Sequence, residues 1–117
     1  MKPWFADLYA NVDAMRLEEF AAGLAPDVEV VVGNNAPMKG RQAAKEGIGH
    51  FFSTIQGLKH NVINVVEDNG LTFLEAKVNY LRKDGREVTV PVVTVLERRD
   101  DLVKSLRIYF DVAPVYA

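Results

Sequence analysis

Two apolar runs between Arg86 and Asp111 constrain the fold more than any other stretch of the sequence. The first run, REVTVPVVTVLER, is β-branched almost throughout and apolar on both faces, as in a central strand covered on two sides. The second run alternates between two faces, with Leu102, Leu106, Ile108, Phe110 and Val112 on one and Val103, Ser105, Arg107, Tyr109 and Asp111 on the other. The polar segment 99–101 predicts a turn, so the two runs form a β-hairpin.

Length and charge narrow the class of protein. A chain of 117 residues fits one domain, residues 1–117, that is large enough to bury a core. Lys and Arg (14) nearly balance Asp and Glu (16), and the two signs are interspersed, so neither nucleic acid nor an anionic membrane is expected as a partner. No cysteine is present, which excludes disulfides and thiolate sites. Without a signal-peptide pattern or a run of ~18 apolar residues, we expect a cytoplasmic protein.

The remaining patterns place helices before strands. An apolar stripe with i, i+3, i+4 spacing predicts a first helix, Asp13 is positioned to cap a second, and residues 41–55 predict a third, in which Gly47 and Gly49 suggest a close neighbour. A short strand at 28–32 and a loop at 34–40 lie between the helices. Strands at 58–67 and 71–82 are joined by Asp-Asn-Gly, and Lys-Asp-Gly leads into the hairpin. This order predicts an α+β fold, with helices on one face of a curved antiparallel sheet.

Two polar rows are predicted on strands that flank the central one. Glu75, Lys77 and Asn79 share one row with apolar neighbours, and Arg107, Tyr109 and Asp111 share the other. A solvated or dimer-forming sheet face explains these rows. A partly apolar cavity with a few convergent polar groups explains them too.

The order of elements, together with three local motifs, resembles the NTF2-like superfamily. The motifs are the helix that opens with Gly40-Arg41, the proline in Val90-Pro91-Val92, and the final Tyr109-Phe110-Asp111. Within the superfamily the match is to the SnoaL-like polyketide cyclase and limonene-epoxide-hydrolase branch. The resemblance implies a cone-shaped α+β fold around a deep apolar pocket, and commonly a homodimer.

The same resemblance directs attention to Asp111, Lys77 and Asn79 as catalytic candidates. Asp111 stands where the family's last-strand aspartate would, and Lys77 and Asn79 stand where the epoxide hydrolases carry Arg-x-Asp. An asparagine does not exchange protons near neutral pH, so one of the proton-transferring groups that open the epoxide in those enzymes is missing here. The carboxylates of ketosteroid isomerases would fall near Val32 and Val93, which excludes that chemistry. Three roles stay open for Asp111: acid/base, ligand-orienting group, or member of a structural ion pair.

The two histidines, His50 and His60, are interpreted as surface or rim residues. They are far apart in the sequence and form no metal-binding motif, so neither a metal nor another cofactor is expected.

These observations lead to two functional hypotheses. The first is a cofactor-independent isomerase, cyclase or hydrolase acting on a small apolar or mixed-polarity molecule through a pocket aspartate. The alternative is a non-catalytic ligand-binding or dimerising accessory domain. In both, the dimer would form through the sheet. The residues expected to line the pocket are Phe5, Tyr9, Val32, Phe52, Phe73, Val93 and Tyr109.

Overall fold

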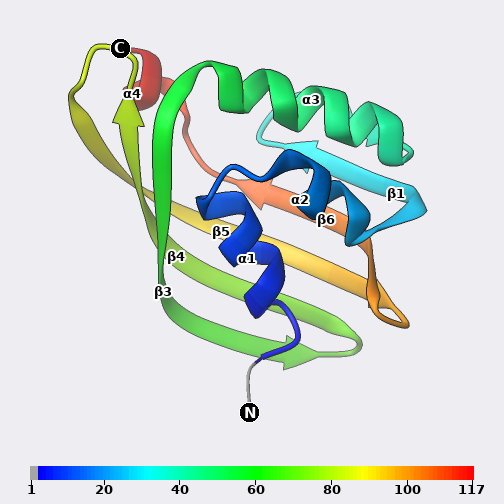
Figure 1. Cartoon of the computed structure of the whole chain (residues 1–117). Coiled ribbons are helices and arrows are strands. Elements are labelled where there is room, and N and C mark those ends of the chain that lie inside the picture. The colour runs from blue at the N-terminus through cyan, green and yellow to red at the C-terminus, as the bar shows by residue number, and fades with distance from the viewer. Residues whose placement is uncertain (1–2) are drawn as a thin grey trace.

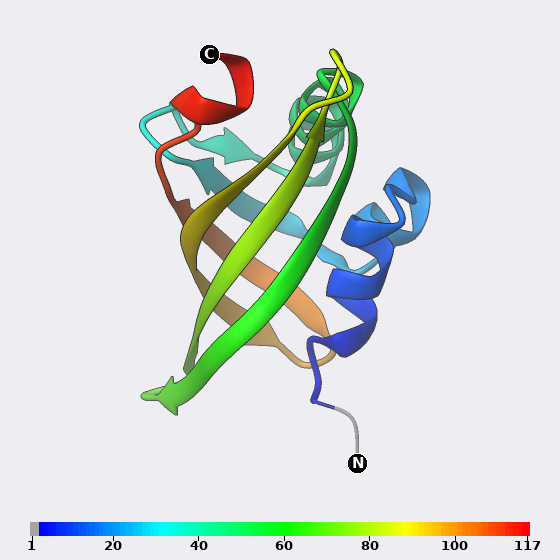
Figure 2. The ribbon, with the colours of Figure 1, turned by 90° about the vertical axis from the view of Figure 1, so that its left-hand side faces the viewer.

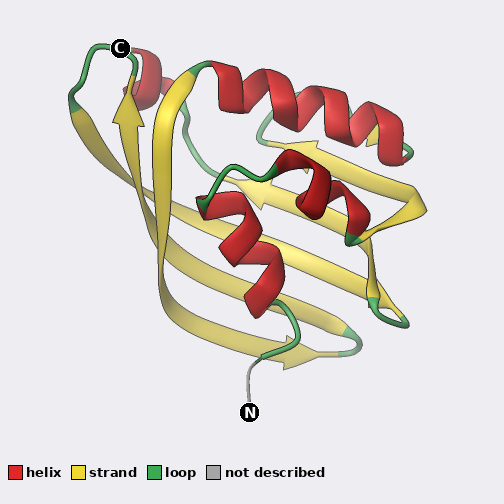
Figure 3. Ribbon diagram, viewed as in Figure 1, coloured by secondary structure: helices red, strands yellow, loops and turns green. Residues whose placement is uncertain are grey.

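The computed structural model describes residues 3–117 and places four helices and six strands in them (Figures 1 and 3). In chain order these are α1 (Ala6–Asp13), α2 (Leu17–Ala22), β1 (Leu24–Val32), β2 (Met38–Lys39), α3 (Arg41–Ser53), β3 (Ile55–Asp68), β4 (Leu71–Arg82), β5 (Glu87–Arg99), β6 (Leu102–Tyr109) and α4 (Ala113–Tyr116). Helices therefore come before the long strands, as the sequence predicts. None of the described helices combines the length and apolarity that a bilayer crossing demands.

All six strands form one curved, unclosed sheet in the order β2-β1-β6-β5-β4-β3. Neighbouring strands are antiparallel except β1 and β6, which run parallel, so the sheet is mixed. Figure 2 shows its strong curvature, with α1 and α2 on one side, and Figure 1 shows α3 across the top. The predicted α+β cone is confirmed, with one parallel pair added to the predicted antiparallel sheet.

The hairpin turns follow the predicted chemistry. Asn69 and Gly70 join β3 to β4 with φ of 51° and 77°, the positive values that a two-residue primed turn requires. Asp100, with φ of 58°, begins the short turn between β5 and β6. Both turns hold their flanking strands in antiparallel register.

The two glycines of α3 are places of close approach, as the sequence suggests. A Cβ atom on Gly47 would lie 2.0 Å from Sδ of Met38, and one on Gly49 would lie 2.8 Å from a Leu17 methyl carbon. Helix α3 therefore packs closely against both β2 and α2, which closes one side of the core.

Three local expectations were wrong, each for a physical reason. Strand β1 begins at Leu24, four residues before the predicted start at Val28, because a register irregularity between Leu24 and Glu29 lets the strand pass through Pro26. A bulge at Lys104 in β6 shifts the alternation, so Val103 is buried with the core instead of facing outward. Asp13 does not cap α2, which begins after Arg16 with no side-chain cap.

The hydrophobic core lies between the helices and the facing side of the sheet. Strand β5 contributes Val90, Val92 and Leu96 to it, and Phe20 of α2 is 2% exposed. The opposite side of β5 was expected to be covered as well. Within the described chain it is covered only in part, since Val95 is 7% exposed on that side but Val93 is 38% exposed.

Candidate functional site

A cavity of about 60 Å³ lies between the helices and the sheet. Its wall is mostly apolar, and it includes the predicted pocket residues Tyr9, Val32 and Phe52. Three further polar side chains reach it from different strands: His60 from β3, Tyr80 from β4 and Thr94 from β5. A mainly apolar cavity with a few convergent polar groups is the usual form of a small-molecule site.

A polar contact joins Asp13 to His60, which lines this cavity. Oδ1 of Asp13 lies 2.7 Å from Nδ1 of the His60 ring. The backbone N–H of His60 also donates to the same carboxylate, at 3.2 Å to Oδ1 and 3.1 Å to Oδ2. Both side chains are largely buried, His60 at 11% and Asp13 at 18% exposed. Asp13 therefore fixes the end of α1 to the edge strand β3 and holds the imidazole ring in one orientation.

This contact also selects the tautomer of His60. An ionised carboxylate only accepts hydrogen bonds, so Nδ1 must carry the proton that it donates to Asp13. In the neutral ring Nε2 then has a free lone pair. No residue that the structure describes hydrogen-bonds Nε2, and the ring lines the cavity. The neutral form of His60 thus has an acceptor nitrogen on a ring that lines the cavity.

Tyr9 completes the polar corner beside His60. Its ring packs against the imidazole with the centroids 4.8 Å apart and the planes at 64°. Burial raises the pKa of Tyr9 to about 12, the hydrogen bond to Thr94 opposes this rise, and the negative charge of Asp13 adds to it. The phenol therefore keeps its proton at neutral pH and is able to donate it in a hydrogen bond. Burial likewise raises the pKa of Tyr80.

The three residues that the resemblance proposed for catalysis do not meet at this cavity. Lys77 and Asn79 lie in β4, where the side chains that alternate with them, Ala76, Val78 and Tyr80, fill the core. Because strand residues alternate between faces, Lys77 and Asn79 point to the outer face of the sheet. Lys77 is exposed, and the amide of Asn79 donates to Oγ1 of Thr89 at 3.2 Å.

Asp111 lies beyond the end of β6, at the rim of the fold. Its side chain is exposed, and Oδ1 accepts a hydrogen bond of 3.0 Å from the backbone N–H of Ala113, at the first residue of α4. It lines an outer hollow of about 230 Å³ that it shares with Phe51 and Phe110. Asp111 therefore accepts a hydrogen bond at the start of α4 and lies outside the inner cavity.

The expected pocket residues divide between the two faces of the sheet. Phe73, Val93 and Tyr109 are 37%, 38% and 54% exposed on the outer face, because each occupies the outward parity of its strand. Phe5 is buried, but it packs edge-on against Trp4 and Tyr9 instead of lining the cavity.

His60 and Asp13 are the functional candidates that sequence reasoning missed. His60 follows Leu58 at a spacing of two, which places it on the core face of its strand. Asp13 follows Tyr9 at a spacing of four, which places it on the same side of α1 as the apolar stripe. The sequence therefore indicated a polar residue on the core-facing side of each element. It did not indicate that the two residues meet, because they are 47 positions apart.

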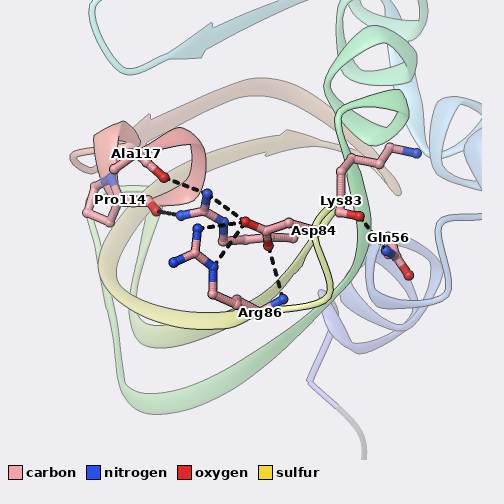
Figure 4. A network of polar contacts seen from close by, with 7 residues as sticks. Gln56, Lys83, Asp84, Arg86, Pro114 and Ala117 are labelled. Atoms are coloured by element: carbon pink, nitrogen blue, oxygen red, sulfur yellow. Dashed lines mark hydrogen bonds and ion pairs between the residues drawn. The ribbon is translucent and has the colours of Figure 1, made fainter.

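A polar network fixes the C-terminal segment near the outer hollows (Figure 4). The Arg82 guanidinium donates to the carbonyl oxygens of Pro114 and Ala117, at 3.1 Å and 2.5 Å. It also forms an ion pair of 3.0 Å with Asp84, whose pKa the hydrogen bonds from Arg86 lower to about 2. Helix α4 is thereby tied to the β4–β5 loop and kept beside the loop that follows β1, as Figure 2 shows.

No three His, Asp or Glu side chains among residues 3–117 are grouped closely enough to hold a metal ion. The chemistry available at the cavity is that of an imidazole, a carboxylate that orients it, the two neutral phenols of Tyr9 and Tyr80, and the hydroxyl of Thr94.

Comparison with known proteins identifies the family. The family model for the SnoaL-like domain matches residues 5–106. No curated protein sequence matches the chain. Among solved structures, TerC co-crystallised with polyporic acid is similar at a TM-score of 0.82 and 19% identity, over 95% of this chain and 91% of TerC.

Two other structures show the same fold at low identity. A hypothetical protein with a ketosteroid-isomerase-like fold from Catenulispora acidiphila, in complex with trimethylamine, has a TM-score of 0.87 at 17% identity, over 98% of this chain and 90% of that one. A limonene-epoxide-hydrolase-like (LEH-like) epoxide hydrolase from M. tuberculosis has a TM-score of 0.79 at 15% identity, over 97% and 84%. The family model and the shared fold agree, and the chain belongs to the SnoaL-like domain family.

Proposed function

We propose that this chain is a cofactor-independent isomerase or cyclase that moves a proton next to the carbonyl group of a small, largely apolar molecule. The observation that carries the proposal is the Asp13–His60 pair, with Nδ1 held by the carboxylate and the ring facing an apolar cavity. Imidazole is the side chain that exchanges protons near neutral pH, and a carboxylate behind it stabilises the imidazolium that forms.

The geometry supports a two-step reaction. In the first step Nε2 of His60 takes a proton from the carbon next to the carbonyl, and the electron pair of that C–H bond moves onto the carbonyl oxygen as an enolate. The neutral Tyr9 phenol donates a hydrogen bond to that oxygen, and the apolar wall strengthens this interaction by excluding water. In the second step the His60 imidazolium gives the proton back. If the substrate carries a C=C bond next to the enolate, the proton goes to the far carbon of that bond, the C=C bond shifts into conjugation with the re-formed carbonyl, and isomerisation results. If the enolate carbon instead attacks a second carbonyl of the substrate, the π pair of that C=O moves onto its oxygen, which takes the proton from the imidazolium, and ring closure gives a hydroxy ketone.

Epoxide hydrolysis is supported less well by the same residues. That chemistry needs one group to activate water and another to protonate the epoxide oxygen. Lys77, Asn79 and Asp111 supply neither at the inner cavity, because the first two lie on the outer face and the third holds α4.

The test is exchange of the α-protons of cyclopentanone in D₂O, followed by ¹H NMR. Cyclopentanone has six non-hydrogen atoms, and a cavity of 60 Å³ has room for about four to six water-sized groups, so the ketone is close to the limit of the site. We expect the wild-type protein to accelerate exchange, His60→Gln to reduce it to the buffer rate, and Tyr9→Phe to slow it by about tenfold to a thousandfold.

His50→Gln is the matched control, because His50 is exposed on α3 and does not line the inner cavity. Equal exchange rates in the wild type and His60→Gln would contradict the proposal. Binding of cyclopentanone without exchange would favour the alternative, a ligand-binding protein with no catalytic activity.

We also propose that two copies associate through the outer face of the sheet. Val66, Phe73, Val93 and Tyr109 are exposed there, and strand pairing places Val66 beside Phe73 and Val93 beside Tyr109. A contiguous exposed apolar patch on a sheet is typical of an interaction surface. Sedimentation equilibrium should give a dimer for the wild type and a monomer for Val93→Lys. A wild-type monomer at all concentrations would contradict this assembly.

A further inference from the structure

The inner cavity is small compared with the space beside it. An open hollow of about 660 Å³ lies between α3, the loop that follows β1, and α4. Sites for drug-sized ligands are usually about 300 to 1,000 Å³, whereas the inner cavity offers only about 60 Å³. A ligand of ordinary metabolite size that reaches His60 therefore needs more room than the cavity alone provides.

The two spaces share part of their walls. Val32 and Phe51 line both the inner cavity and this hollow, and Phe110 lines the cavity and the neighbouring hollow beside Asp111. All three side chains are partly exposed. On the cavity side, the ring of Phe51 packs edge-on against Tyr80 with the centroids 6.0 Å apart. The boundary between the two spaces therefore consists of side chains, which change rotamer more easily than a strand or helix moves.

The lining of the larger hollow indicates what it would accept. Ala36, Met38 and Ala43 join Val32 and Phe51 to give it a mainly apolar surface. The absence of a side chain on Gly47 matters here, because a Cβ atom would lie 2.0 Å from Sδ of Met38 and displace the methionine from its place. Its lining also includes the exposed polar residues Asn35, Glu46 and His50, but most of its surface is apolar. A hollow of this composition favours an uncharged hydrocarbon chain.

We infer that the ligand has two parts: a compact oxygen-bearing ring that occupies the inner cavity beside His60, and an unbranched apolar arm that passes Phe51 into the larger hollow. Phe51 is then the residue that sets the boundary between ring and arm, and so determines which ring sizes are accepted. This inference rests on the proposed function, because it places the reacting carbonyl at His60. It adds the class of substrate, an alkyl-substituted cyclic ketone.

The first test uses a series of probes: cyclopentanone and its 2-propyl, 2-pentyl and 2-heptyl derivatives. NMR titration should show the dissociation constant falling about threefold to fourfold for each added methylene group until the hollow is filled. Two methyl groups report on the two spaces separately. The Ile48 methyl signals, from the cavity wall, should shift with every probe, whereas the Met38 methyl, in the hollow, should shift only with probes that carry an arm.

The second test blocks the hollow. Ala43→Trp should remove the dependence on arm length and leave cyclopentanone binding unchanged, whereas Ala10→Trp, on an exposed position of α1, should change neither. Ala36→Trp, on the loop side of the same hollow, gives a second blocking variant if Ala43→Trp does not fold. Phe51→Ala should admit cyclohexanone at least tenfold more tightly than the wild type does.

The outcomes separate this inference from the proposed function. If cyclopentanone binds but the arm adds no affinity, or if both blocking variants keep the full dependence on arm length, the two-part ligand is refuted and the His60 site stands. If no member of the series binds to the wild type, the proposed function is refuted and this inference falls with it.

Discussion

Replacing Asp13 by alanine tests the contact that organises the site. The carboxylate accepts the His60 ring N–H at 2.7 Å and the His60 backbone N–H at 3.1 and 3.2 Å. Hydrogen bonds to a charged group contribute about 1.5 to 3 kcal/mol each. Strand β3 lies at the edge of the sheet, so no further strand is available to accept the His60 N–H in place of Asp13. Both side chains keep some exposure, so we expect the variant to lose about 2 to 4 kcal/mol of unfolding free energy.

Two further variants make this prediction specific. Asp13→Asn keeps an oxygen that accepts the backbone N–H, so it should lose only about 1 kcal/mol. Asp101→Ala removes the same charge from an exposed turn and should stay within about 0.5 kcal/mol of the wild type.

Equilibrium urea unfolding, followed by circular dichroism, measures these differences. In a chain of 117 residues a loss of 2 to 4 kcal/mol corresponds to a fall in Tm of about 8 to 16 °C. If Asp13→Ala is as stable as Asp101→Ala, the contact does not hold α1 to β3 and the reasoning is refuted.

Three other predictions concern pH, the C-terminal helix and a turn. The pKa of Tyr9 is about 12 in the folded protein against 10.0 ordinarily, so the contribution of its protonated form to stability is complete below pH 10 and is lost as the pH rises to 12. Urea unfolding should show a smaller loss of stability over this pH range in Tyr9→Phe than in the wild type. An equal loss would contradict the burial of this phenol. Arg82→Ala removes one hydrogen bond to Pro114 in α4 and one to Ala117 just after it, so amide exchange in that helix should accelerate about tenfold. Arg86 contacts Asp84 but not α4, so Arg86→Ala should leave this exchange unchanged. Gly70→Ala should cost about 1 kcal/mol through its φ of 77° alone, since an added Cβ meets nothing within 4 Å; a neutral effect would contradict the turn geometry.

Local sequence patterns predicted most of the fold. The turn at Asn69 and Gly70 fixes the β3–β4 register because few residue pairs adopt two positive φ values. Periodicity likewise predicted the helix over Arg41 to Ser53 within two residues. By contrast, the bulge at Lys104 and the extension of β1 through Pro26 depend on pairing with distant strands, which a single sequence does not show.

The site was harder to predict than the fold. The resemblance directed attention to Asp111 and β4, but whether a side chain faces the cavity depends on strand parity and on where β6 ends. The Asp13–His60 contact joins the end of a helix to an edge strand, so neither residue belongs to a local motif. Hydrogen bonding between two elements, which only the folded chain brings together, created the candidate site.

The most direct test of the central claim is the tautomer of His60, measured by long-range ¹H–¹⁵N correlation NMR above the titration range of imidazole. The Asp13 contact predicts a proton on Nδ1 and an unprotonated Nε2 in the wild type, with this preference lost in Asp13→Ala. A wild-type ring protonated on Nε2, or a tautomer mixture that Asp13→Ala leaves unchanged, would show that His60 does not present its base to the cavity and would contradict the proposed catalytic pair.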